Sequence, residues 1–201
     1  MKAIRYKLHF AALTVAVVVF CLAKDLRFPY WISDINFFHY GLMGALHSTC
    51  IVVSLRNRKA ARPVIAFCFI VLATAWSAAT PILGLGGSII WAPFSDFLRR
   101  NQLGSLTIFL TGSAIGASGY WLLVRLFWLK SLGWKDWLRT VALCLAATLL
   151  SAVAVNALNP RIDIFSPIIT IAWWFAFSIS LYWSEMSCWA TGSTMVKGTV
   201  L

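Results

Sequence analysis

One apolar run of the chain carries four residues whose types and spacing suit a metal or haem site: His39, Met43, His47 and Cys50. At 3.6 residues per turn, intervals of four, four and three place these side chains on one stripe of a helix. Imidazole and sulfur ligands suit copper and other soft metals, so His47 with Met43 or Cys50 is the candidate metal site. The two histidines stand about 12 Å apart along the axis, which is too far for one ion. No nearby carboxylate orients either ring. We therefore expect histidines that hydrogen-bond within a helix bundle and no bound cofactor, with a metal or haem as the alternative.

A run of small residues at 112–119 (Gly-Ser-Ala-Ile-Gly-Ala-Ser-Gly) indicates close helix packing. Gly112 and Gly116 stand four residues apart, so they share one helix face and let another backbone approach, and Gly119 extends the run. Gly41 and Ala45 repeat this spacing more weakly in the run at 37–55. The pattern leaves open whether the packing partner lies in this chain, in a second copy or in another subunit.

The end of that run, Gly116-Ala117-Ser118-Gly119, resembles the Gly-x-Ser-Gly motif of rhomboid intramembrane proteases. The serine of that family lies on the fourth of six core helices, and histidines on the second helix, here His39 and His47, extend the resemblance to about two helices. The resemblance implies Ser118 as a nucleophile, which needs a base to take its proton. In rhomboids that base is a histidine on the sixth helix, and this chain has no histidine after His47. We therefore expect no catalytic residues, and an inactive rhomboid-like protein is the most that the motif supports.

A glycine-rich stretch at 81–94 is flanked by two prolines and contains Gly84, Gly86 and Gly87. Gly and Pro are the poorest helix formers, so we expect a broken or re-entrant segment here, followed by a short interfacial helix that Ser95 caps. Non-helical backbone at membrane depth is tolerated where it lines a cavity. Gly84, Gly86 and Gly87, with Asp96 at the mouth, are therefore a possible solute or ion site.

The elements that position these residues follow from the composition of the 201-residue chain. It is 61% hydrophobic and 11% charged, whereas soluble domains carry about 25% charged residues, and its mean hydropathy is +0.82. The bilayer must therefore be its solvent, and we expect an all-α polytopic membrane helix bundle forming a single domain over 1–190. A polar tail at 191–201 is predicted to be flexible. The six predicted spans are 8–23, 37–55, 63–80, 103–129, 141–158 and 164–183.

The net charge of +11 is explained by membrane topology rather than by nucleic-acid binding. Cytoplasmic loops concentrate Lys and Arg, and a cytoplasmic N-terminus puts twelve of the seventeen basic residues in inner loops. We therefore predict a multi-pass protein of the cell inner membrane with both termini cytoplasmic and no nucleic-acid partner. Two inner loops supply cationic residues for partner docking: Arg56, Arg58, Lys59, Arg62, Lys130, Lys135 and Arg139.

Three functions from different classes fit these features. The favoured one is a non-catalytic membrane subunit that anchors or assembles a multi-protein complex through its cationic cytoplasmic face. A small oligomeric transporter or channel built on the segment at 81–94 is the first alternative. A haem- or metal-binding redox subunit is the second. The expected partners are the lipid bilayer and other membrane or cytoplasmic subunits, or further copies of this chain.

Overall fold

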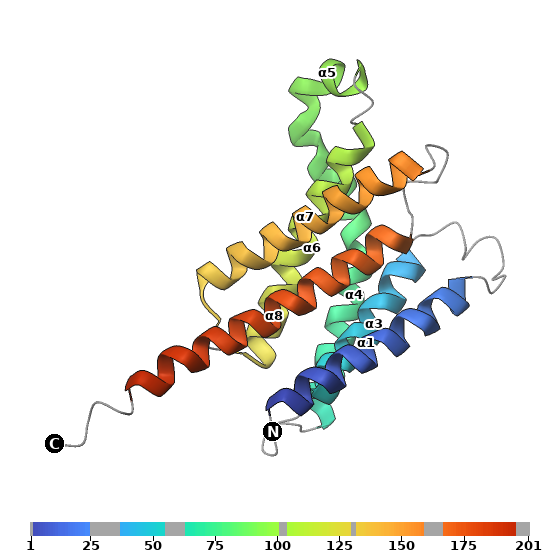
Figure 1. The fold of residues 1–201 in the computed structure, drawn as a ribbon. Helices are drawn as coiled ribbons and strands as arrows, with labels where there is room; N and C mark the ends of the chain where they lie inside the picture. The colour runs from blue at the N-terminus through green and yellow to red at the C-terminus, as the bar shows by residue number, and fades with distance from the viewer. Residues whose placement is uncertain are drawn as a thin grey trace.

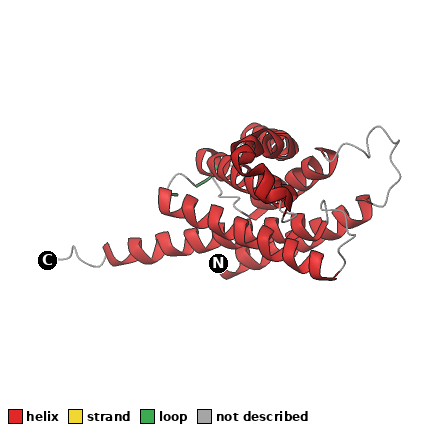
Figure 2. Ribbon diagram, turned by 90° about the horizontal axis from the view of Figure 1, so that it is seen from above, coloured by secondary structure: helices red, strands yellow, loops and turns green. Residues whose placement is uncertain are grey.

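Helices make up almost all of the computed structural model, which describes residues 2–24, 37–54, 63–100, 104–129, 132–158 and 167–195. Within these ranges no strand occurs (Figure 2), so the all-α prediction is confirmed. The elements are α1 (Lys2–Lys24), α3 (Phe37–Ser54), α4 (Pro63–Gly87), the 3-10 helix η1 (Ser88–Phe94), α5 (Ser95–Arg100), α6 (Gly104–Phe127), α7 (Trp134–Leu158) and α8 (Pro167–Met195).

Three helical stretches are long and apolar enough to cross a membrane: Pro63–Phe97, Leu106–Phe127 and Trp134–Val155. Three further apolar stretches are shorter: Lys7–Leu22, Tyr40–Ser54 and Ile168–Trp183. Large apolar side chains such as Phe67, Leu126 and Leu150 are 60–69% exposed on the outer faces of these helices. By length and composition the described chain therefore has three candidate membrane spans, while a membrane bundle of six spans remains a prediction.

Each long helix packs mainly on its neighbours along the chain, so the described bundle follows the chain order from α1 to α8. The last helix, α8, packs on α7 and also touches α1, so the first and last helices of the chain lie side by side (Figure 1). This closure matters for the site because it brings residues near the N-terminus against residues more than 160 positions later.

The expected break at 81–93 is wrong in its first half, because α4 continues through Pro81 to Gly87. Proline lacks the N–H that would bond the carbonyl of Ser77, and glycine is a weak helix former in water. In an apolar environment, however, each backbone polar group needs an internal partner, which favours a continued helix. The backbone changes to 3-10 geometry only at Ser88, and Ser95 then begins α5, near the predicted start of a short helix.

Three other helices are longer than their predicted spans, and the first of them, α1, begins at Lys2 where residue 8 was expected. Helix α7 begins at Trp134, seven residues before the expected 141, because Asp136 lies in its first turn and bonds the preceding loop. Helix α8 continues past 183 to Met195, since no glycine or proline interrupts 184–191. The first part of the predicted tail at 191–201 is therefore helical, and residues 196–201 lie outside the described part of the chain.

Candidate functional site: a buried chain of histidines

A continuous chain of hydrogen bonds runs through the interior of the bundle and joins four helices. His9 comes from α1, His47 from α3, Tyr120 from α6 and Ser178 from α8. The Ser178 hydroxyl oxygen lies 2.8 Å from Nε2 of His47 and 3.2 Å from Nε2 of His9. Nδ1 of His47 lies 3.0 Å from the Tyr120 hydroxyl, and Nδ1 of His9 lies 3.2 Å from the hydroxyl of Ser54. None of these five side chains is more than 3% exposed.

Ser54 donates to a backbone carbonyl, and this determines which group is the donor in every hydrogen bond of the chain when both histidines are neutral. Ser54 donates its only hydroxyl proton to the carbonyl of Ile51, at 3.0 Å, so it accepts from Nδ1–H of His9. Nε2 of His9 must then accept the Ser178 hydroxyl proton, which leaves the Ser178 oxygen to accept from Nε2–H of His47. Nδ1 of His47 in turn accepts from the Tyr120 hydroxyl. Each donor therefore has one acceptor, and the two rings carry their protons on opposite nitrogens.

Aromatic rings enclose both histidines. The Trp174 ring lies 4.5 Å from the His47 ring and is tilted by 35°, so it faces the imidazole. Tyr182 meets the His9 ring at 5.0 Å, and the two imidazoles are 5.7 Å apart at nearly a right angle. The indole face that His47 meets is one that attracts a cation.

Ser178 and His47 lie close enough for a nucleophile and its base, but the surroundings do not fit acyl transfer. Both side chains are fully buried, so no substrate reaches the hydroxyl. The Ser178 proton points to His9 in the bond order derived above, while His47 already donates to the Ser178 oxygen. The arrangement is suited to joining helices.

A comparison with known protein families, curated proteins and solved structures finds no match for this chain. The site must therefore be interpreted from its own geometry.

The predicted metal ligands with described side chains lie at or near this chain of hydrogen bonds, and His47 is part of it. Both ring nitrogens of His47 are used in hydrogen bonds. Met43 and Cys50 are buried side chains of the same helix, α3. The side chain of His39 lies outside the described residues. Among the side chains that are described, no group of three His, Cys, Asp or Glu residues is close enough to hold a metal ion.

Ser118, the serine of the rhomboid-like motif, bonds neither of the two histidines whose side chains the structure describes, His9 and His47. Its hydroxyl donates to the carbonyl of Ala114 at 2.8 Å and accepts the indole N–H of Trp137 at 3.0 Å. The serine that does meet histidines is Ser178 on the last helix. The motif therefore marks a helix contact in this protein.

The sequence left open whether the small residues of α6 pack within this chain, on a second copy or on another subunit. In the structure they face other helices of this chain. Gly112 lies against Gly84 and Thr80 of α4, and Gly116 lies against Thr80 and Trp173. Gly119 lies under the ring of Trp76, whose Nε1 donates to the Gly116 carbonyl at 3.2 Å. On α3, Gly41 lies against Ala78 and Thr74 of α4, and the carbonyl of Ala45 accepts from the hydroxyls of Ser48 and Thr49.

The residues of the predicted solute site are not gathered around one opening. Gly84 is buried against α6, and Gly87 faces Thr111 and Ile115. Gly86 faces open space, and Asp96 is exposed on α5. The solute site stays a prediction, and the observed role of Gly84 is helix packing.

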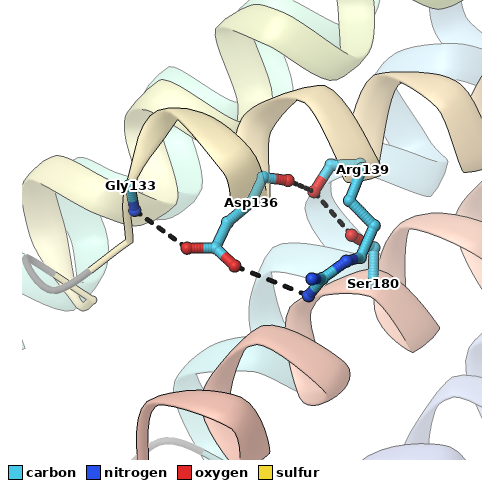
Figure 3. A network of polar contacts seen from close by, with 5 residues as sticks. Gly133, Asp136, Arg139 and Ser180 are labelled. Atoms are coloured by element: carbon cyan, nitrogen blue, oxygen red, sulfur yellow. Dashed lines mark hydrogen bonds and ion pairs between the residues drawn. The ribbon is translucent and has the colours of Figure 1, made fainter. Parts of the chain in front are cut away.

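The predicted docking residues are described only in part. Arg56, Arg58, Lys59, Arg62 and Lys130 lie outside the described residues. Lys135 is exposed at the start of α7, while Arg139 pairs with Asp136 at 3.6 Å and lies 5.3 Å from the ring of Trp183. Figure 3 shows this network, in which the other Asp136 oxygen accepts from the backbone N–H of Gly133 at 2.9 Å.

The sequence did not point to four residues of this site: His9, Ser54, Tyr120 and Ser178. A polar residue inside an apolar run is a usable signal, because such residues are costly in a bilayer and find polar partners. His9 and Ser178 are such residues, but their pairing depends on contact between α1 and α8, which no local pattern reveals.

Proposed function

We propose that this chain is a non-catalytic membrane subunit that assembles with another membrane protein, and that η1 and α5 form its docking arm. The observation that carries this proposal is an apolar surface on the arm that stays largely exposed, although α6 contacts both of its elements. Figure 1 shows α5 at the end of the molecule opposite the N-terminus. The large side chains of the arm are widely exposed: Ile89 73%, Ile90 69%, Phe94 58% and Phe97 61%.

The length of α4 supports the proposal that a partner protein covers the arm. The 25 residues of α4 span about 37 Å, whereas the hydrocarbon core of a bilayer is about 30 Å thick. If Pro63 lies at one boundary of the core, Ile89 and the residues after it lie beyond the other boundary. Burial of an apolar side chain of this size contributes about 1.5–3 kcal/mol, so an apolar partner surface would stabilise the arm substantially.

The interior of the bundle also fits a subunit better than an enzyme. The polar side chains of the buried chain bond one another, and the small residues of α6 contact α4 and α8. Exposed Lys135 at the start of α7 offers a second, cationic contact for a cytoplasmic partner.

Native mass spectrometry of the gently extracted protein tests this function. We expect a second protein in fixed stoichiometry, and we expect the double variant Ile90→Ser and Phe94→Ser to lose it. The matched control is Leu150→Ser, because Leu150 is 69% exposed but lies on α7, outside the arm. A chain that carries only lipid would contradict the proposal and place the arm in the headgroup layer. A homo-oligomer without a partner would favour the transporter or channel alternative, and flux in liposomes would then be measured.

A further inference from the structure

The corner between α6 and α7 combines positive charge with an exposed apolar flank. We propose that this corner binds an anionic phospholipid: the exposed guanidinium of Arg125 holds the headgroup phosphate, and an acyl chain lies along the apolar face of α6. One candidate span ends at Phe127 and the next begins at Trp134, so the corner lies at the depth of the headgroups. The inference is independent of the proposed docking arm, because η1 and α5 lie at the opposite end of the molecule (Figure 1).

The sequence around the corner supplies more cations than acids. Arg125 lies in the last turn of α6, and Lys135 and Arg139 lie in the first two turns of α7. Asp136 is the only acidic residue from 97 to 162. One of its oxygens accepts from the loop backbone at 2.9 Å, and the other lies 3.6 Å from Nη1 of Arg139. Within the described chain Arg125 therefore has no carboxylate partner, and an anion from outside matches its charge.

Trp121 holds the guanidinium of Arg125 against the side of α6. The central carbon of the guanidinium lies 5.4 Å from the centre of the Trp121 ring, which is one helical turn earlier. A guanidinium stacked on an aromatic face still presents the N–H donors at its edge, in a fork that matches two phosphate oxygens. Because this contact restricts the side chain before the lipid arrives, less conformational freedom is lost on binding.

Buried donors without acceptors lie on the same side of α6. The indole N–H groups of Trp121 and Trp128 are buried and have no hydrogen-bond partner in the described chain. The backbone N–H of Trp128 still bonds the carbonyl of Val124, so helical spacing continues to 128 and places Arg125 on one face with both indoles. Nearly all buried donors in native proteins have an acceptor. The corner is therefore short of acceptors, which the oxygens of a phosphodiester supply.

The exposed side of α6 next to Arg125 is apolar, which favours a lipid over inorganic phosphate. Leu122 is 47% exposed one turn closer to the middle of the span, and Leu126 is 60% exposed. These side chains contact an acyl chain, while the headgroup of the same molecule reaches Arg125. Trp134 and Trp137 are exposed at the start of α7, and indoles favour the boundary between hydrocarbon and headgroups.

The structure favours Arg125 over Arg139 as the residue that binds the phosphate. Arg139 pairs with Asp136, lies 5.3 Å from the Trp183 ring and has a side chain that is 34% exposed. An anion at Arg139 would be repelled by the Asp136 carboxylate. Arg125 is exposed at the end of the bundle that the charge bias predicts to be cytoplasmic, where membranes carry anionic lipids.

Native mass spectrometry tests the site on the full chain, with any subunit that co-purifies, released from nanodiscs. The nanodiscs contain phosphatidylglycerol and phosphatidylcholine with identical acyl chains. We expect the protein to retain phosphatidylglycerol with a preference of about fivefold, because one cation near the surface attracts an anionic lipid by about that factor. Equal retention of the two lipids would overturn the proposal. Loss of the bound lipid in excess inorganic phosphate would also overturn it and leave a site for free phosphate.

Arg125→Gln removes the proposed contact, and Lys135→Gln is the matched control, because it removes the same charge from the exposed start of α7. We expect Arg125→Gln to lose the preference and the control to keep most of it. Arg125→Lys should keep part of the preference, since lysine has the charge without the planar fork. Equal losses in Arg125→Gln and Lys135→Gln would indicate a diffuse attraction and overturn the site. If Arg125→Gln does not fold, the wild-type preference and the phosphate competition decide the proposal.

Discussion

Gly84 of α4 and Gly112 of α6 lie backbone against backbone. A Cβ atom added to Gly84 would lie 3.0 Å from Cα of Gly112 and 3.1 Å from the carbonyl oxygen of Ile108. A Cβ atom added to Gly112 would lie 3.6 Å from Cα of Gly84, which is ordinary contact. The contact is therefore tighter on the α4 side, and Gly84 is the glycine that sets how closely the two helices approach.

We expect Gly84→Ala to destabilise the bundle by about 1–3 kcal/mol, because backbone atoms cannot give way as a flexible side chain can. Gly86→Ala is the matched control, since a Cβ atom there meets nothing within 4 Å. Alanine favours helix equally at both positions, so the control should be neutral or stabilising by up to about 1 kcal/mol. Thermal unfolding in detergent, followed by loss of helical circular dichroism, measures both. Equal stabilities would mean that α4 and α6 do not touch at Gly84.

The glycine spacing shows what sequence could predict of this fold. Intervals of four between Gly112 and Gly116 indicated a packing face, and that face does contact another helix. The same sequence reasoning assigned Gly84 to a break, because helix propensities measured in water count glycine and proline against a helix. In this structure the missing side chain of Gly84 permits the contact with α6, and the helix continues.

A double-mutant cycle tests the contact between Trp76 and Gly119. The Trp76 ring occupies the space that a side chain at position 119 would need. We expect Gly119→Ala alone to destabilise the protein by about 1–3 kcal/mol through overpacking. In the Trp76→Phe background the cost should fall, because the smaller ring leaves room for the methyl group. An unchanged cost, measured by the same unfolding experiment, would show that the two residues act independently.

Asp136 stabilises the start of α7 by bonding the backbone N–H of Gly133 (Figure 3). This is the arrangement of a first-turn carboxylate that reaches back to the helix cap, and it also pairs with Arg139. We expect Asp136→Ala to lower the free energy of unfolding by about 0.5–2 kcal/mol. Asp136→Asn should lose less, because an amide oxygen still accepts from Gly133 while the ion pair is gone. If Asn and Ala cost the same, the ion pair with Arg139 matters more than the cap.

The buried chain shows where sequence reasoning ends. His47 of α3 was identified, and the expectation that it hydrogen-bonds within the bundle is met by Tyr120 and Ser178. Its partners come from α6 and α8, at separations of 73 and 131 residues. Helical periodicity places residues on a face of one helix, but it does not say which helix that face meets. His9 therefore could not be assigned to the same site before α1 and α8 were seen together.

The number of broken bonds should decide how much each variant of the chain destabilises the bundle. Ser178→Ala leaves two imidazole nitrogens without a partner, whereas Tyr120→Phe leaves one imidazole nitrogen without a partner and keeps the ring that packs 5.0 Å from Trp174. Because a hydrogen bond between membrane helices contributes about 0.6 kcal/mol and an unpaired buried group costs about 1–3 kcal/mol, we expect Ser178→Ala to cost about twice as much as Tyr120→Phe.

Ser118→Ala, which removes only a bond to an exposed indole and a local helix bond, should change stability by about 0.5 kcal/mol or less. Unfolding in mixed detergent micelles ranks the three variants. A Ser118→Ala cost equal to that of Ser178→Ala would mean that the histidine chain does not hold α1, α3, α6 and α8 together.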